Sequence, residues 1–106
     1  MRVPSEFSVR VEDAGEAAHL RLTGRFDASS LPALDDTIGE ARRRNVVMDL
    51  DGLTFMDGAA WLAVMAWEHR VRDWGKDFRL VNVRGRIRKI FEVTETEYLL
   101  SEVVRT

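Results

Sequence analysis

Apolar and polar residues alternate along the first part of the chain, as they do in strands with one buried face. The alternation covers residues 7–12 and returns at 18–23, after a segment of turn-forming residues. It predicts two strands joined as a β-hairpin. Residues 45–49 form a β-branched apolar run instead, which is typical of a strand buried on both faces. A fourth strand is predicted over residues 77–83.

Three later segments carry apolar residues at helical spacing. The first is marked by Leu31, Leu34, Ile38 and Ala41, and residues 42–44 are three arginines that suit its last turn. Ser29 or Ser30 is expected to cap this helix, with Pro32 in the first turn.

The second helix is expected over residues 58–74, with Gly75 as its stop. A third is marked by Ile87, Ile90, Phe91 and Thr94, and a short helical piece is expected over residues 96–103.

The predicted order is β-β-α-β-α-β-α. Helical connections between the later strands indicate parallel pairing, whereas the opening hairpin is antiparallel. We therefore expect an α/β fold with a mixed four-stranded sheet, an N-terminal β-hairpin and three to four helices. The 106 residues suffice for one core, so residues 1–106 are expected to form a single domain.

Composition excludes several classes of function. A net charge of −2 gives no electrostatic case for binding nucleic acid or anionic lipid. The absence of cysteine removes disulfides and thiolate chemistry, and it fits a reducing cytosol. The longest apolar run, residues 59–67, is too short to cross a bilayer, and the N-terminus does not resemble a secretory signal. We expect a cytoplasmic protein without membrane insertion.

The start of the second helix is the most informative local feature. A strand at residues 46–50 is expected to run into a short loop that ends in Asp57. Asp57 is expected to cap the helix by accepting a hydrogen bond from the N–H of Ala59 or Ala60. The other free N–H groups would then lie beside Gly58, where they favour a phosphate or an acidic partner.

Three motifs in this order resemble the STAS domain, which anti-sigma factor antagonists share with sulfate transporter tails. Residues 22–27, L-T-G-R-F-D, are similar to the family's L-T-G-x-L-D. Residues 46–57 are similar to its V-V-x-D-L-x-x-L-x-F-M-D, and residues 88–94 to its R-x-x-x-x-x-T. The resemblance covers nearly the whole chain and implies the STAS fold and a protein-binding role.

One departure from the family pattern affects the expected regulation. The family usually continues D-S-S-G-L-G, whereas residues 57–62 here read D-G-A-A-W-L. By the resemblance, Gly58 stands where antagonists carry a serine that their kinase partner phosphorylates, and Ala59 replaces the next serine. Phosphorylation there would add about −2 charge. One interpretation of Gly58 and Ala59 is drift in a domain that has lost this role. The other is a binder that cannot be switched at Gly58, because the unphosphorylated state is the one that binds the anti-sigma kinase in the family.

The second helix also predicts a contact surface. Ala60, Val64, Trp67, Val71 and Trp74 form one stripe and are expected in the core. The helix side roughly opposite this stripe carries Gly58, Leu62, Met65 and His69, and Trp61 lies between the two sides. Leu62 and Met65 are thus expected to be exposed, and such apolar patches mark interfaces with a partner or a second copy. The candidate partner-binding residues are Asp27, Asp57, Gly58, Ala59, Trp61, Leu62 and Met65.

Each candidate has a simpler structural interpretation. Asp27 also suits a turn ahead of the first helix. A further candidate for holding an acidic partner is the basic stretch Arg84, Arg86, Arg88 and Lys89, which also suits a solvated helix face. His19 and His69 lack metal-ligand spacing, and neither a nucleophile and base pair nor a glycine-rich phosphate loop is present. We expect no metal, no cofactor and no enzyme activity.

The expected function is binding of a kinase-type anti-sigma factor, a histidine-kinase-like ATPase. Two alternatives remain. The chain could be the STAS subunit of an ABC-type lipid transport complex, or a sensor that holds a nucleotide or another small anion at the helix start. A homodimer formed through Leu62 and Met65 uses the same surface as the partner.

Overall fold

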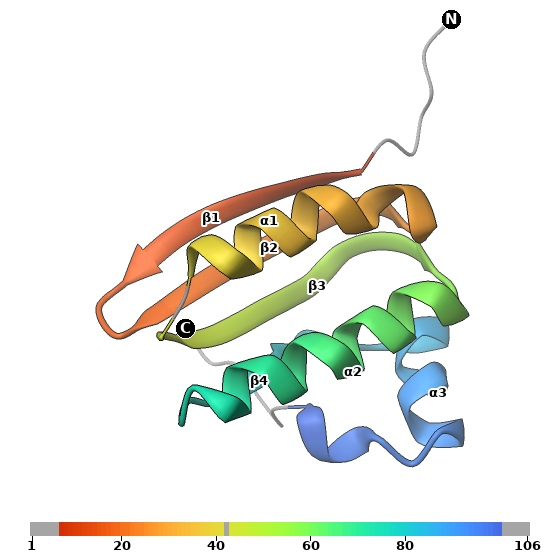
Figure 1. Cartoon of the computed structure of the whole chain (residues 1–106). Coiled ribbons are helices and arrows are strands. Elements are labelled where there is room, and N and C mark those ends of the chain that lie inside the picture. The colour runs from red at the N-terminus through yellow and green to blue at the C-terminus, as the bar shows by residue number, and fades with distance from the viewer. Residues whose placement is uncertain (1–6, 42, 101–106) are drawn as a thin grey trace, which may run out of the picture.

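The computed structural model describes residues 7–41 and 43–100. Four strands, three α-helices and two short 3-10 turns follow the predicted order (Figure 1). They are β1 (Ser8–Ala14), β2 (Ala17–Phe26), η1 (Ala28–Ser30), α1 (Leu31–Glu40), β3 (Asn45–Met56), α2 (Gly58–Asp73), β4 (Phe78–Val81), α3 (Gly85–Val93) and η2 (Glu97–Leu99).

The strands form one mixed sheet in the order β1-β2-β3-β4. β1 and β2 pair as an antiparallel hairpin, and β2, β3 and β4 are parallel neighbours. The parallel pairs are connected through α1 and α2, as such pairs require. The predicted fold class is confirmed.

α1 and α2 lie on the same face of the sheet (Figure 1). Their inward side chains meet the inward side chains of β2 and β3 in a single hydrophobic cluster. Its largest fully buried members include Phe26, Leu20, Leu22, Met48 and Ile38. The Trp67 ring on α2 stacks on Phe26, with centroids 6.2 Å apart and planes 3° apart. This contact fixes α2 over the end of β2.

β3 is longer than predicted, and the loop expected before Asp57 is instead strand. β3 has 12 residues and pairs along β2, which has 10. The two extra residues of β3 are accommodated by two register shifts in the pairing. The buried positions Leu50, Leu53 and Met56 are therefore three residues apart, which breaks the alternation of a regular strand. Gly52 lies at this irregularity, where a Cβ atom would come within 2.7 Å of the Thr23 side chain.

The ends of other elements also differ from the predictions. β4 covers Phe78–Val81 only, and η2 is a single turn at Glu97–Leu99, with residues 101–103 outside the described residues. α1 ends at Glu40, so the arginines follow the helix instead of forming its last turn. Arg42 lies outside the described residues, and Arg44 donates to the carbonyls of Gly15 and Ala17, which ties the end of α1 to the hairpin.

Candidate functional site

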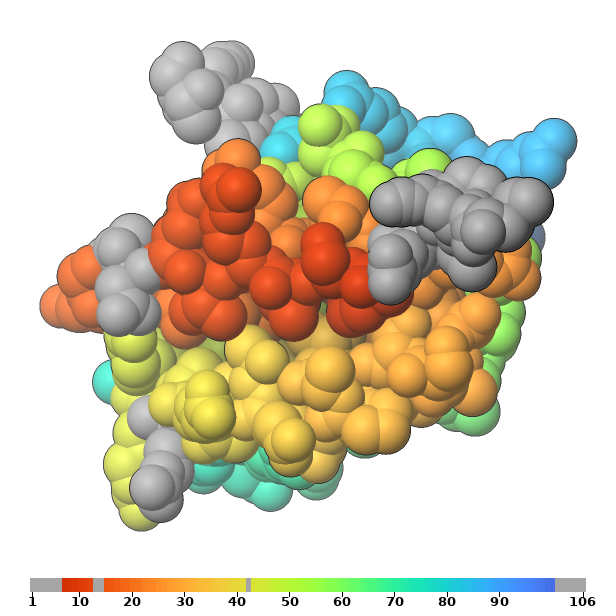
Figure 2. All heavy atoms as spheres, turned by 90° about the horizontal axis from the view of Figure 1, so that it is seen from above, coloured from red at the N-terminus to blue at the C-terminus, as the bar shows by residue number. Residues whose placement is uncertain are grey.

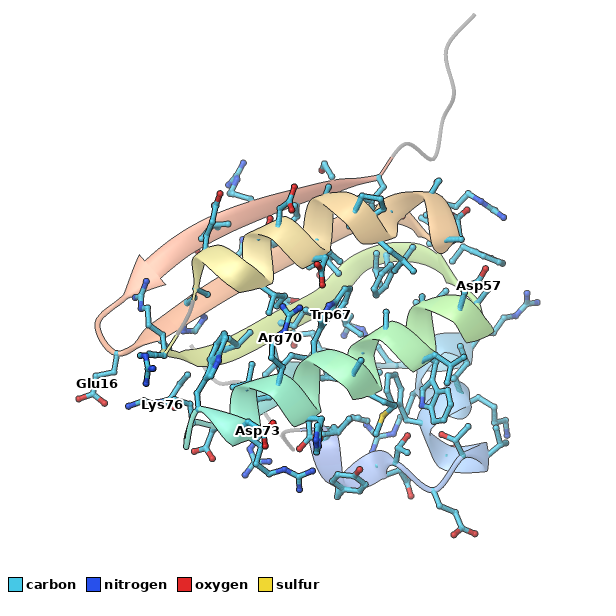
Figure 3. The ribbon with its side chains drawn as sticks, viewed as in Figure 1. Glu16, Asp57, Trp67, Arg70, Asp73 and Lys76 are labelled. Carbon is cyan, nitrogen blue, oxygen red and sulfur yellow. The ribbon has the colours of Figure 1, made fainter. Side chains whose placement is uncertain are left out.

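Two acidic residues follow the carboxyl ends of neighbouring parallel strands. Phe26 of β2 and Met56 of β3 are paired in the sheet, so Asp27 and Asp57 both leave the sheet at the same edge. Each residue has extended backbone angles and caps the helical turn that follows it. The starts of η1 and α2 therefore lie beside each other, and we define this region as the helix-start edge. Figure 3 shows Asp57 at the first turn of α2.

Asp57 caps α2 as predicted. Its carboxylate Oδ1 accepts a hydrogen bond from the N–H of Ala60 at 2.9 Å. The helix ends as predicted too, with Trp74 as C-cap and Gly75 in the left-handed region at φ 79°. α2 is thus fixed at both ends by local features of the sequence.

Replacing Asp57 with alanine is expected to destabilise the protein by about 1 kcal/mol, because the N–H of Ala60 loses its acceptor. Asp57→Asn is the matched control, since its side-chain oxygen can still accept that hydrogen bond. Urea unfolding followed by circular dichroism measures both variants. Equal losses in the two variants would contradict the capping role.

Gly58 and Ala59 lie exposed at the first turn of α2. The backbone of Gly58 does not require glycine, because its φ is not positive and a Cβ atom placed there meets nothing within 4 Å. A serine side chain therefore fits at this position without rearrangement. The first turn of α2 therefore has open space beside position 58.

Asp27 is held by a local network that the sequence interpretation did not anticipate. Its Oδ1 accepts from the Ser29 N–H at 3.0 Å and from the Ser29 hydroxyl at 2.7 Å, and its own N–H donates to the Ser30 hydroxyl. Arg25 donates from Nε to Asp27 Oδ2 at 3.3 Å and lies over the Phe55 ring at 3.9 Å. Asp27 thus caps η1 and positions a cation above an aromatic ring.

These contacts stabilise the charged form of Asp27. The pKa of Asp27 is lowered below its ordinary value, mainly by the hydrogen bond from the Ser29 hydroxyl. The Ser29 N–H and Arg25 lower it further. Because the pKa of Asp27 is depressed in the folded state, its carboxylate stabilises the fold at pH values above the ordinary pKa of an aspartate. That contribution is lost as the pH falls through the folded-state pKa.

Carboxyl carbon NMR is expected to show an Asp27 titration midpoint below that of an ordinary aspartate. In Ser29→Ala the midpoint should rise, because the strongest hydrogen bond to the carboxylate is removed. Thr37→Ala serves as a control, since its hydroxyl bonds the Ala33 carbonyl instead. An unchanged midpoint in Ser29→Ala would contradict this account.

The faces of α2 match the predicted stripes except at one position. Ala60, Val64, Trp67 and Val71 are buried, Trp74 packs against the core, and Leu62 is 63% exposed. Met65 was predicted to be exposed, and this was wrong: it is half-buried and packs against the core. Met65 packs against the hydrophobic cluster that includes Leu99 of η2, so the buried part of α2 is wider than a single stripe.

Trp61 is also half-buried, and it connects α2 to that segment. Its indole Nε1 donates to the Thr96 hydroxyl at 3.2 Å, and Thr96 bonds the Thr94 hydroxyl at 2.8 Å. Thr96 is 35 residues away along the chain, so local sequence patterns gave no signal for this contact. Trp61 therefore presents only part of its ring beside the exposed Leu62.

The basic residues around α3 are partly paired. Arg84 forms an ion pair with Asp51, and Arg88 Nε lies 3.4 Å from Glu92 Oε2. Arg86 and Lys89 are exposed and form no ion pair with any residue in the described part of the chain. The exposure of Arg86 and Lys89 favours the interpretation that they belong to a solvated helix face.

The open face of the sheet carries a groove of about 620 Å³ that the sequence did not indicate. Asp49 lies in it and accepts from Asn82 Nδ2 at 3.1 Å and from the Asp51 N–H at 2.9 Å, with Arg21 Nε 3.9 Å away. These contacts connect β2, β3 and the residue that follows β4. His19 also borders the groove, far from the exposed His69, which lies 3.8 Å from Asp73 on α2.

A family model described as "Mlab, STAS domain" matches residues 9–101, which is most of the chain. The chain belongs to the STAS domain family. No curated protein matches the sequence. No helix in the described ranges has the length and apolar character needed to span a membrane.

Solved structures of STAS proteins share the fold. An anti-sigma factor antagonist from Mycobacterium paratuberculosis is 22% identical, with a TM-score of 0.81 over 98% of this chain and 92% of that one. The unphosphorylated form of the anti-sigma factor antagonist SpoIIAA is 17% identical, with a TM-score of 0.80 over 92% and 90%. The phosphorylated form of Bacillus SpoIIAA has a TM-score of 0.76 at 17% identity over 92% and 93%. At these identities the likeness shows the fold.

Proposed function

We propose that this STAS domain is a non-enzymatic regulator that binds a kinase-type anti-sigma factor through the helix-start edge. The observation that carries the proposal is the exposed surface formed by Gly58, Ala59 and Leu62 at the start of α2, flanked by Asp57 and Asp27. The fold shared with anti-sigma factor antagonists supports the class of partner.

The chemistry of this surface suits protein binding. Leu62 provides a large apolar group that is 63% exposed, and burial of its apolar surface in an interface is favourable. Asp27 and Asp57 are held rigid by their capping hydrogen bonds, so they would lose little conformational freedom on binding. Met65 supports the surface from within the core, and Trp61 contributes the exposed part of its ring.

The proposed binder differs from a phosphorylation-switched antagonist at Gly58 and Ala59. Neither residue has a hydroxyl group, so a kinase partner cannot phosphorylate the start of α2 at these positions. We propose that the chain remains in the binding-competent state in the presence of ATP. Release would then require a signal other than phosphorylation at the helix start.

Leu62→Asp is expected to weaken binding to a purified kinase-type anti-sigma factor of the host by about tenfold or more, equivalent to roughly 1.4 kcal/mol. The reason is that the change removes the apolar anchor and places a charge in the interface. His69→Asp is the matched control: it adds the same charge on the same helix face, roughly 10 Å further from the helix start. Isothermal titration calorimetry measures both variants. Equal affinities for Leu62→Asp and the native chain would contradict this docking surface.

A transport-complex subunit is the second candidate. The matching family model carries the name Mlab and is not described as an anti-sigma factor antagonist. In this alternative the same α2 surface would dock on the ATPase of an ABC-type lipid transporter. Neighbouring genes distinguish the two: a sigma factor with a histidine-kinase-like ATPase supports the first, and a permease with an ABC ATPase supports the second.

A further inference from the structure

β1 forms an edge of the sheet, and its outer side has no partner strand among residues 7–41 and 43–100 (Figure 1). An edge of this kind presents unpaired N–H and C=O groups that can pair with another strand. β1 pairs with β2 over all seven of its residues without a register shift. It also contains no proline, so neither a bulge nor a missing donor blocks this edge.

An apolar side chain lies half-exposed at the middle of this edge. Val11 is 50% exposed and borders a groove of about 220 Å³ between β1 and the second half of α1. Figure 2 looks onto this side of the molecule and shows β1 in red beside α1 in yellow and orange. α1 therefore leaves the outer edge of the hairpin uncovered.

The neighbours of Val11 carry opposite charges. Arg10 and Glu12 have side chains 72% and 44% exposed, and they point to the face of the sheet opposite Val11. We propose that a second copy of the chain pairs with β1 in antiparallel orientation, with a twofold axis at Val11. Residues of the two strands whose numbers sum to 22 then lie opposite each other.

This register is selected by the charges. It places Arg10 opposite the partner's Glu12 in both halves, and Val11 opposite the partner's Val11 on the helix side. Moving the axis to Arg10 or to Glu12 would place two like charges opposite each other, which destabilises the pair. Among the registers that keep both helix layers on the same side, only this one places Arg10 opposite Glu12.

The resulting dimer has one continuous eight-stranded sheet. α1 lies between β1 and α2, so the surface of α2 formed by Gly58, Ala59 and Leu62 lies on the far side of α1 from this edge (Figure 1). This inference does not rest on the proposed partner. It also differs from self-association through Leu62 and Met65, which would cover the surface of α2.

Sedimentation velocity over a dilution series tests the dimer. The native chain should approach twice its 12.2 kDa mass at high concentration. Arg10→Glu and Glu12→Arg alone should each raise the dimer dissociation constant by about tenfold or more, because both symmetric pairs become repulsive. Circular dichroism confirms folding, which exposed substitutions should leave intact.

Two rescue experiments make the test specific to this register. The double variant Arg10→Glu/Glu12→Arg should dimerise as the native chain does, because the charges are exchanged within each pair. Mixing the two single variants should produce a heterodimer, because one strand then carries two acidic residues and the other two basic ones. A native chain that stays at 12.2 kDa, or a dimer that neither single variant weakens, would overturn the proposal.

Discussion

Trp67→Ala is expected to lower the free energy of unfolding by about 3–5 kcal/mol, a large part of the roughly 5–15 kcal/mol of a typical domain. Trp67 is 3% exposed, and its ring stacks on the fully buried Phe26. Its Nε1 also donates to Asp35 Oδ1 at 3.0 Å, which connects α2 to α1. Removing the ring leaves a cavity between the two helices and the sheet.

The control for this prediction is Trp67→Phe. Phenylalanine keeps a ring against Phe26 but removes the N–H donor, so its loss should be clearly smaller. Arg70 also donates to Asp35 Oδ1, at 3.1 Å, so this carboxylate keeps a partner in both variants. Figure 3 shows Trp67 and Arg70 on α2. Urea unfolding followed by circular dichroism measures the losses, and a loss below about 1 kcal/mol in Trp67→Ala would contradict this packing.

Gly58→Ser is expected to make binding sensitive to ATP. The native chain should bind the kinase-type anti-sigma factor with the same affinity before and after ATP is added. The variant should bind equally well without ATP, since the serine side chain fits into open space. With ATP, phosphorylation would add about −2 charge beside Asp57 and weaken binding by about tenfold or more.

Intact-protein mass spectrometry reports whether the variant is phosphorylated, and calorimetry with and without ATP reports affinity. Gly58→Ala is the control, because it adds a Cβ atom but no hydroxyl group. If ATP releases the native chain because it is phosphorylated at another position, the proposal of a binder that escapes the kinase fails.

Local patterns predicted most of the fold because most elements are regular. The alternation along β1 and β2 and the helical spacing in α2 each follow from one buried face. The second half of β3 was missed because its buried residues are three apart, and the two register shifts that make this possible depend on pairing with β2. A single strand sequence carries no signal for such a shift.

In the candidate site, too, contacts within one segment could be predicted, and contacts between distant segments could not. The Asp57 cap could be predicted because its acceptor and donor are three residues apart. The cation over Phe55 joins residues from β2 and β3, and the Trp61 contact with Thr96 joins α2 to the segment after α3. The prediction that Met65 is exposed was wrong because the periodicity of one helix does not show which other parts of the chain pack against it.

Purification of the tagged native protein from its own host, followed by mass spectrometry of the proteins that accompany it, tests the central claim most directly. A kinase-type anti-sigma factor should be recovered with the native chain and should be depleted with Leu62→Asp. Recovery of an ABC transporter ATPase in its place, depleted by the same substitution, would contradict the anti-sigma factor role.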